Sequence, residues 1–407
     1  MMRHVFTLVW NRKRSTGLIL VEILICFLVL CGLLSSAIYL GTQWSEPLGF
    51  EYENVWSVEI SGLAFRADEE EMAVNRQTLS GLIRAAKSLP EVEAVAISTN
   101  TPYSGSSWGD GTRIDGEPVH FLWTLASQDL PEVLRLKLLH GRWPDENDGA
   151  LGYRPVVITR NFARDLFKTE NPVGQDMPIY NDDGELTEPE DDAEIHRVVG
   201  VAETYRRRGA VEPTEYSMFL AVDFANGESL PEEMLIRVRS GTTAAFEERL
   251  VRTLQGIAPQ WSYDTSLLEA KRRNLLWTYL GPMIMAAVVA VFLITMVGLG
   301  LVGVLWLSVT RRTSELGLRR AMGASGISVR RQVVGEIWAL TAVAVAAGSV
   351  IFLQLPLFGA NFGVGWSIFL GGVILATLVI YAFVTVCGLY PAWLATRVQP
   401  ATALQYE

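Results

Sequence analysis

The sequence predicts an α+β membrane protein, with four transmembrane helices and a large extracytoplasmic α/β domain that stands on a helical stalk. Half of the 407 residues are hydrophobic, and four runs are apolar and nearly free of charge. These runs are residues 16–40, 275–309, 333–357 and 366–389. Each is longer than the roughly 20 residues that cross the hydrocarbon of a bilayer. The segment between the first two runs exceeds two hundred residues, which is enough for a domain with its own core.

The N-terminal segment, residues 1–15, places Val5, Leu8 and Val9 on one helical face ahead of a basic cluster. This pattern is typical of a short cytoplasmic interfacial helix on the inner leaflet, or of the cytoplasmic end of the first spanning helix. The first run is longer than the roughly 7–15 apolar residues of a signal peptide, and no A-x-A site follows it. We therefore expect residues 16–42 to remain in the protein as a spanning helix.

Lysine and arginine beside the runs set the orientation, because short loops rich in these residues stay in the cytoplasm. Residues 310–332 contain six arginines and a single acid, Glu315, whereas the loop at 356–365 has no charge. We expect both termini and the arginine-rich loop to be cytoplasmic, and the long segment to lie outside. The remaining segments are a stalk and second spanning helix in 275–309, spanning helices in 333–355 and 366–390, and a cytoplasmic tail in 391–407.

The extracytoplasmic segment, residues 43–274, is acidic. It holds 40 of the 44 acids but 23 of the 34 lysines and arginines, a net charge of −17. This charge disfavours nucleic acid as a partner. It is compatible with a cationic or zwitterionic ligand, although an acidic solvated surface is the simpler explanation and the one we favour. All three cysteines lie in apolar runs, so no disulfide is expected in this domain.

Two strand–helix–strand patterns open and close the extracytoplasmic domain. The expected elements are, in order, 55–60, 70–88, 92–98, 234–238, 242–257 and 261–264. Two such units predict a ferredoxin-like sheet built from residues 53–100 and 227–265. The intervening residues 101–226 are rich in glycine, proline and turn dipeptides, and predict a mostly β inserted subdomain.

The second apolar run contains 35 residues. As one helix it would be roughly 52 Å long, against ~30 Å of hydrocarbon, so part of it must stand outside the bilayer as a stalk. Gly281 and Pro282 lie in this outer part. We expect a kink or break there, because proline lacks an N–H and clashes with the preceding turn. The pair is therefore a predicted stalk hinge.

The sequence carries no convincing catalytic pattern. No lysine follows a glycine, which excludes a P-loop, and HExxH is missing. GxSxG occurs once, as GSSWG at 105–109, in a stretch that is more economically explained as a turn. The four histidines are isolated from one another. The sequence therefore predicts a non-enzymatic protein that binds no metal or cofactor of its own.

Three polar residues lie within or beside the spanning segments: Glu22, Gln332 and Glu336. A carboxylate inside the bilayer is usually paired, faces a polar seam or extends to the headgroups. Proton coupling is the alternative for Glu22, weakened because one carboxylate is not a relay.

The stretch RRTSELGLRRAMGASGISVRRQVVGEIWAL, with the closing PAWLATRVQPATALQYE, resembles the FtsX-like permease domain of MacB-type ABC transporters. The coupling motif positions are Arg312, Glu315, Leu316, Gly317, Leu318, Arg319, Arg320, Ala321, Gly323, Ala324 and Ser325, followed by Gln332 and Glu336. Plain positive-inside anchoring would explain the arginines, but not the Glu-x-Gly and Ala-x-Gly-Ala spacing. In the outer domain, LPEVLRLKLLHGRWP, VVITRNFARDLFKTENPVGQDMPIY and HRVVGVAETYRRRG resemble the MacB periplasmic core, which is porter-like.

This resemblance implies a permease subunit, in a homodimer or paralogous heterodimer, that works with two copies of an ABC ATPase binding ATP and Mg. Nucleotide-driven motion would enter through a short coupling helix in 310–332 and reach the outer domain through the stalk, which is called mechanotransmission. MacB carries its ATPase ahead of the first membrane helix, whereas this sequence begins about 15 residues before one, so we expect a separate ATPase.

The resemblance also places the protein in a bacterial inner membrane and implies export of a peptide, lipoprotein, antibiotic or similar substrate. A periplasmic adaptor and an outer-membrane channel are further partners that it allows. The alternative function is that of an FtsX-like signalling or scaffold protein, which activates an extracytoplasmic hydrolase without transport.

Overall fold

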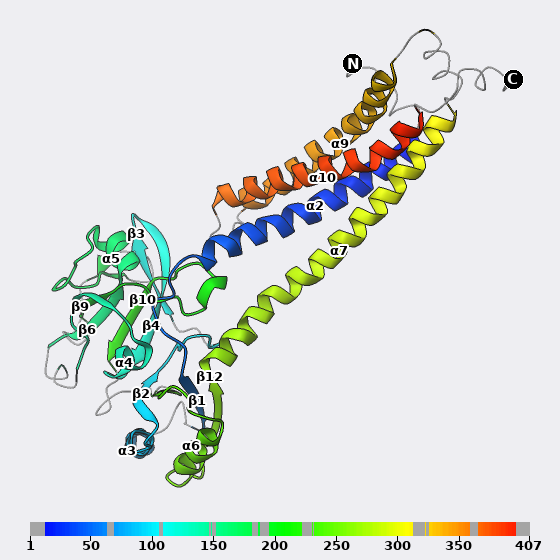
Figure 1. The fold of residues 1–407 in the computed structure, drawn as a ribbon. Coiled ribbons are helices and arrows are strands. Elements are labelled where there is room, and N and C mark those ends of the chain that lie inside the picture. The colour runs from blue at the N-terminus through cyan, green and yellow to red at the C-terminus, as the bar shows by residue number, and fades with distance from the viewer. Residues whose placement is uncertain are drawn as a thin grey trace. The chain divides into compact units, whose positions relative to one another are not determined.

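The computed structural model describes most of the chain, which folds into two compact units (Figure 1). One unit is Gln43–Thr278, and the other combines Met1–Thr42 with Tyr279–Glu407. The described residues are 13–62, 69–105, 109–145, 148, 152–180, 186–187, 195–221, 230, 232–311, 322, 325–358 and 365–395.

The unit formed by the two ends of the chain is helical (Figure 1). Its helices are α2 (Lys13–Trp44), the later part of α7 (Leu268–Arg311), α9 (Gly326–Leu357) and α10 (Trp366–Ala395). Their buried faces share one apolar core, to which Phe27 of α2, Leu301 of α7 and Ile380 of α10 belong. Many outward-facing side chains are also large and apolar, as expected for helices surrounded by lipid. Among the described residues, four helices are long and apolar enough to span a membrane, which confirms the predicted number.

The other unit is built on a ten-stranded mixed sheet in the order β12-β1-β11-β2-β4-β10-β6-β9-β5, with β3 paired to β4. Its strands are β1 (Val55–Ser61), β2 (Val92–Ser98), β3 (Gly109–Ile114), β4 (Glu117–Ala126), β5 (Leu138–Gly141), β6 (Arg154–Thr159), β9 (His196–Ala202), β10 (Ser217–Ala221), β11 (Glu233–Val238) and β12 (Ser262–Leu267). A separate hairpin pairs β7 (Ile179–Tyr180) with β8 (Leu186–Thr187). The helices are α3 (Glu69–Lys87), α4 (Leu130–Leu134), α5 (Arg160–Phe167), the short 3₁₀ helix η3 (Gly209–Val211) and α6 (Ala245–Gln255).

The two predicted strand–helix–strand units are β1-α3-β2 and β11-α6-β12, and they form the antiparallel order β12-β1-β11-β2. This is the ferredoxin-like arrangement expected from the sequence. Helix α3 buries Leu79 and Leu82, and α6 buries Phe246 and Leu250, in one core with Trp56 of β1. The helices form here because their apolar residues recur every three or four positions, and acidic residues occupy their first turns.

The inserted residues are mostly β, as expected, and their strands continue the ferredoxin-like sheet beyond β2. The junction is narrow, because β2 and β4 share a single residue pair, Ser98 with Ala126. Beyond this pair the two strands diverge. Ser127 strengthens the junction, since its hydroxyl oxygen accepts a hydrogen bond from the backbone N–H of Ile97 at 3.1 Å.

Candidate functional site

The predicted coupling residues lie almost entirely outside the described part of the chain, and their role stays a prediction. The residues concerned are Arg312, Glu315, Leu316, Gly317, Leu318, Arg319, Arg320, Ala321, Gly323 and Ala324. Ser325 is described, and it caps the N-terminus of α9. Its hydroxyl oxygen accepts a hydrogen bond from the backbone N–H of Ser328 at 3.3 Å, which satisfies one of the free donors of the first turn.

Glu22 of α2 points toward α7 within the helical unit. A Cβ built on Gly300 would lie 3.0 Å from its Oε2 atom. That oxygen is inaccessible and has no hydrogen-bond partner among the described residues. Gly300 therefore provides the space that this carboxylate occupies. Gln332 and Glu336 lie in the first turns of α9, and both have interaction partners.

The predicted hinge residues Gly281 and Pro282 lie inside α7, which is continuous from Leu268 to Arg311. The expected break is therefore not found. Proline still removes one hydrogen bond, because it has no N–H to donate to the carbonyl of Thr278 four residues earlier. Bending at this point stays a prediction.

Arg206 fastens the C-terminal end of α2 to the loop between β9 and β10. Its guanidinium donates to the carbonyl oxygen of Gln43 at 2.8 Å, to the side-chain oxygen of Gln43 at 2.5 Å and to the carbonyl of Glu212 at 2.9 Å. The side chain is 1% exposed. The last carbonyls of a helix lack intrahelical donors and carry a partial negative charge. A buried guanidinium supplies both the missing N–H donors and a compensating positive charge.

Gly49 allows the backbone after α2 to approach the same loop. Its φ angle is +84°, and a Cβ there would lie 2.0 Å from the carbonyl oxygen of Thr204. The backbone N–H of Arg206 also donates to the carbonyl of Leu48 at 3.0 Å. Only glycine fits this contact, so Gly49 lets the segment after α2 pack closely against the loop between β9 and β10.

Lys271 and Arg272 hold the first turns of α7. The ammonium group of Lys271 donates to the hydroxyl of Ser57 at 2.9 Å and to Glu233 Oε1 at 3.1 Å. The guanidinium carbon of Arg272 lies 4.8 Å from the ring centre of Tyr52 and 5.4 Å from that of Trp44. Such cation–π contacts contribute about 0.5–2 kcal/mol each. The base of α7 is thus joined to β1, to β11 and to the end of α2.

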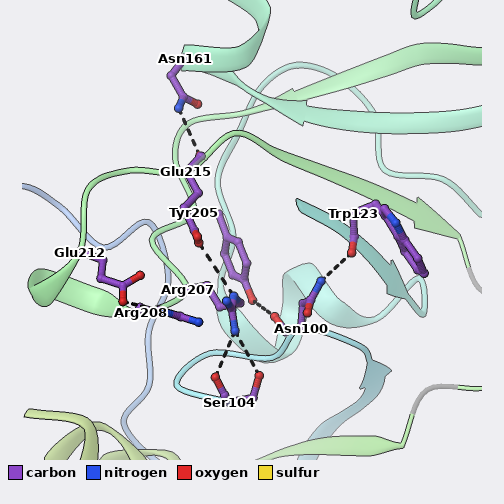
Figure 2. A network of polar contacts seen from close by, with 9 residues as sticks. All are labelled: Asn100, Ser104, Trp123, Asn161, Tyr205, Arg207, Arg208, Glu212 and Glu215. Carbon is purple, nitrogen blue, oxygen red and sulfur yellow. Dashed lines mark hydrogen bonds and ion pairs between the residues drawn. The ribbon is translucent and has the colours of Figure 1, made fainter. Parts of the chain in front are cut away.

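Figure 2 shows a second arginine of the same loop, Arg207, in the centre of a polar network. Its side chain is fully buried, and one Nη1 donates to the carbonyl of Ser104 at 3.1 Å. Its nearest carboxylate is that of Glu215, 4.0 Å away. Burial raises the pKa of Glu215, and the charge of Arg207 opposes this rise. A buried charge of this kind fixes local geometry, because losing a partner would leave the other uncompensated.

The network continues toward the junction between β2 and β4. The hydroxyl of Tyr205 donates to the carbonyl of Asn100 at 3.1 Å, and the amide of Asn100 donates to the carbonyl of Trp123 at 2.7 Å (Figure 2). Tyr103 joins the same loop, since its backbone N–H donates to the carbonyl of Arg207 at 2.9 Å. These bonds hold Tyr103 and Trp123 in fixed positions.

A cavity of about 650 Å³ lies where β2 and β4 diverge, and the first turns of α7 form one of its walls. We call it the acidic pocket. Its charged lining residues are Glu59, Glu232, Glu233 and Lys271. Tyr103, Trp123, Leu125, Leu230 and Leu275 supply apolar surface.

The carboxylates of the acidic pocket lie in an unfavourable environment. Glu59 of β1 is directly opposite Glu233 of β11 in the strand register. Burial raises the pKa of Glu233, Lys271 opposes the rise, and Glu59 adds to it. The pKa of Glu232 is also raised, first by burial and then by the charge of Glu59. The pocket therefore favours a positively charged group.

The sequence did not single out Arg206, Arg207, Lys271 or the acidic pocket as functional. The run of three arginines in the loop after β9 was a signal, because consecutive arginines close to a buried strand need partners. The pocket had no local signal, since Glu59 lies in β1 whereas Glu232 and Glu233 lie just before and at the start of β11, distant in sequence.

Comparison with known proteins relates both units to described families. Residues 25–253 match the MacB-like periplasmic core domain, and residues 287–400 match the FtsX-like permease C-terminal family. The uncharacterized ABC transporter permease YknZ of Bacillus subtilis is 26% identical over 68% of this chain and 67% of its own length. The macrolide export ATP-binding/permease protein MacB of Bdellovibrio bacteriovorus is 27% identical over 66% of this chain.

The MacB protein of Syntrophobacter fumaroxidans is 31% identical over 180 residues, which are 42% of this chain. The chain spans only part of these MacB proteins: 41% of the Bdellovibrio protein and 25% of the Syntrophobacter protein. Among solved structures, the periplasmic region of MacB from Actinobacillus actinomycetemcomitans is similar with a TM-score of 0.37 and 12% identity, covering 57% of this chain and 97% of that structure. The family match covers more than half of the chain, and this protein belongs to the MacB-like, FtsX-like family of ABC transporter permeases.

Proposed function

We propose that this protein is the non-catalytic permease subunit of an ABC transporter, and that it converts ATP hydrolysis by a separate ATPase into movement of its extracytoplasmic domain. The observation that carries the proposal is α7, a single helix of 44 residues that begins next to β12. Its length of about 66 Å exceeds the bilayer thickness. A continuous helix of this length can transmit displacement from the cytoplasm.

The contacts at the base of the stalk support this proposal. A lever must be fixed to what it moves, and Lys271 attaches α7 to β1 and β11 while Arg206 attaches α2 to the inserted strands. Both attachments use charged side chains that are mostly buried. Buried pairs are less screened than surface pairs and keep a single geometry.

In this proposal the coupling motif at residues 312–325 docks on the ATPase, which binds ATP and Mg. Both termini lie in the cytoplasm of a bacterium, and two permeases, identical or paralogous, assemble with two ATPases in the inner membrane. The substrate is a peptide, lipoprotein, antibiotic or similar molecule that leaves from the outer face of the membrane. An adaptor and an outer-membrane channel would extend the path where an outer membrane is present.

Co-purification tests the proposal directly. The full chain, expressed in its own host and extracted under mild conditions, should bring down an ABC ATPase whose hydrolysis is accelerated in the complex. Glu315→Ala should reduce this acceleration at least tenfold, whereas Arg330→Ala, an exposed residue of α9 outside the Glu-x-Gly pattern, should leave it within twofold.

Failure to recover any ATPase would overturn the proposed function. Acceleration of hydrolysis by candidate peptides would support export. Acceleration only by an added extracytoplasmic hydrolase would instead support the FtsX-like signalling role and contradict transport.

A further inference from the structure

We propose that the acidic pocket binds a small organic amine, that is, a positively charged nitrogen attached to an apolar or aromatic body. The volume of about 650 Å³ falls within the roughly 300–1,000 Å³ of small-molecule sites in proteins. The pocket combines a charged end with an apolar wall, and the ligand must match both.

Charge identifies the ligand as a cation. The charged residues that line the pocket are three glutamates and one lysine, a net charge of −2. Glu59 and Glu233 are directly opposite each other on neighbouring antiparallel strands. Like charges in this position destabilise a sheet. Local rules of this kind are usually broken where function requires it.

Lys271 compensates only part of this negative charge. Its Nζ lies 3.1 Å from Glu233 Oε1, while Glu233 Oε2 is inaccessible and has no hydrogen-bond partner in the part of the chain that the structure describes. Within the described residues, Lys271 forms its ion pair with Glu233 and none with Glu59 or Glu232. A ligand ammonium beside Glu59 and Glu232 would relieve the repulsion among the three carboxylates and supply donors that Lys271 does not.

The apolar wall identifies the rest of the ligand. Tyr103 and Trp123 present aromatic surface to the pocket, and Leu125, Leu230 and Leu275 add aliphatic surface. Aromatic faces attract cations and stack on flat rings. The amide of Asn100 holds the backbone of Trp123 (Figure 2). The carbonyl of Arg207 holds the backbone of Tyr103. Both residues are therefore in place before any ligand arrives, which lowers the entropy lost on binding.

A metal ion fits the pocket less well than an amine. Among the described residues, no three histidine, cysteine, aspartate or glutamate side chains are grouped closely enough to hold one. An anion would meet two uncompensated negative charges. The organic cation is the ligand class that satisfies the carboxylates and the apolar wall together.

This inference concerns binding alone and does not require coupling to an ATPase. The test therefore uses the full chain in lipid nanodiscs without nucleotide or partner. Three probes share an indole ring and differ in the head group: tryptamine is a cation, tryptophol is neutral and indole-3-propionate is an anion. Equilibrium dialysis, with empty nanodiscs as the blank, should show saturable binding of tryptamine at least tenfold tighter than of the other two.

Variants locate the site. Glu59→Gln and Glu232→Gln should each weaken tryptamine binding at least threefold. Glu269→Gln removes the same charge from an exposed position in the first turn of α7, outside the pocket lining, and should leave binding within the error of wild type. Lys271→Met should strengthen binding, because it removes the competing cation.

Damage to the fold would weaken tryptamine binding in every variant. Tighter binding by Lys271→Met, together with weaker binding by the glutamate variants, therefore cannot come from damage to the fold. Equal binding of tryptamine and tryptophol would overturn the proposal. So would an equal loss in Glu269→Gln and Glu232→Gln, or the absence of saturable tryptamine binding.

Discussion

The guanidinium of Arg206 lies 2.8 Å from the carbonyl oxygen of Gln43, a residue 163 positions earlier in the chain. This bond closes the end of α2 with a side chain from the loop after β9. Lys271 makes the corresponding attachment for α7. Both helices that connect the spanning segments to the outer domain are therefore fastened by buried cations.

Replacing Arg206 by methionine should lower the free energy of unfolding by about 1–3 kcal/mol. The variant keeps the apolar volume but removes the guanidinium donors from the carbonyls of Gln43 and Glu212, and weakening buried hydrogen bonds of this kind costs about this much. Thermal unfolding in nanodiscs measures the change. The matched control is Arg197→Met, whose exposed ion pair with Asp176 should contribute less than about 1 kcal/mol. Equal effects of the two variants would contradict the clamp.

Gly372→Ala should disrupt the packing of α10 on α2. A Cβ at Gly372 would lie 1.9 Å from Ser35 Oγ and 3.1 Å from the carbonyl oxygen of Cys31, so the Ser35 hydroxyl must rotate away and the helices must separate slightly. Small residues permit such close approach, and overpacking costs about 1–3 kcal/mol. Gly303→Ala is the control, because nothing lies within 4 Å of its added Cβ. Unfolding midpoints in the same lipid should fall for the first variant and stay constant for the second.

Compared with wild type, Glu232→Gln should be more stable at neutral pH and equally stable at acidic pH. The pKa of Glu232 is raised in the folded state by burial and by Glu59. A carboxyl group whose pKa is raised in the folded state stabilises the protein at pH values below its unfolded pKa, near 4.3. This stabilisation is lost as the pH rises through the folded pKa. The two melting temperatures should coincide near pH 4, and the variant should melt higher at pH 7.5.

The control is Glu269→Gln, which should not raise the melting temperature at pH 7.5, because an acidic residue in the first turn of a helix is favourable. A melting temperature of Glu232→Gln that falls below wild type at pH 7.5 would show that Glu232 is stabilised as a carboxylate. That result would contradict the acidic environment described for the pocket.

Gly49→Ala should weaken the attachment of α2 without touching any charge. The added methyl group would overlap the carbonyl of Thr204 and place a non-glycine residue at a φ of +84°. Both effects are unfavourable, and together they should cost about 1–3 kcal/mol. Gly241→Ala shares the positive φ of +88° but meets no atom within 4 Å, so it isolates the backbone term. Limited proteolysis should cut Gly49→Ala faster than either Gly241→Ala or wild type.

The regular elements were predictable because local pattern determines them. The expected helix at 70–88 is α3 at Glu69–Lys87, since its buried leucines recur at helical spacing after an acidic first turn. The spanning helices followed from length and composition in the same way. The continuity of α7 through Pro282 was not predicted, because loss of one hydrogen bond does not break a helix that has many others.

The candidate sites were less predictable because they depend on long-range register. Glu59 meets Glu233 only because β1 pairs with β11 in one particular register. Arg206 meets Gln43 across most of the domain sequence. Strand alternation predicts which face a residue occupies but not which distant residue lies beside it.

The central claim is that nucleotide binding in the cytoplasm moves the outer domain. Spin labels at Val74→Cys, an exposed position on α3, in both permeases of the assembled complex would measure it after the native cysteines are replaced by alanine. The distance distribution between the labels should shift between the ATP-bound and ADP-bound states, and Glu315→Ala should abolish the shift. Identical distributions in the two states of an actively hydrolysing complex would contradict the account.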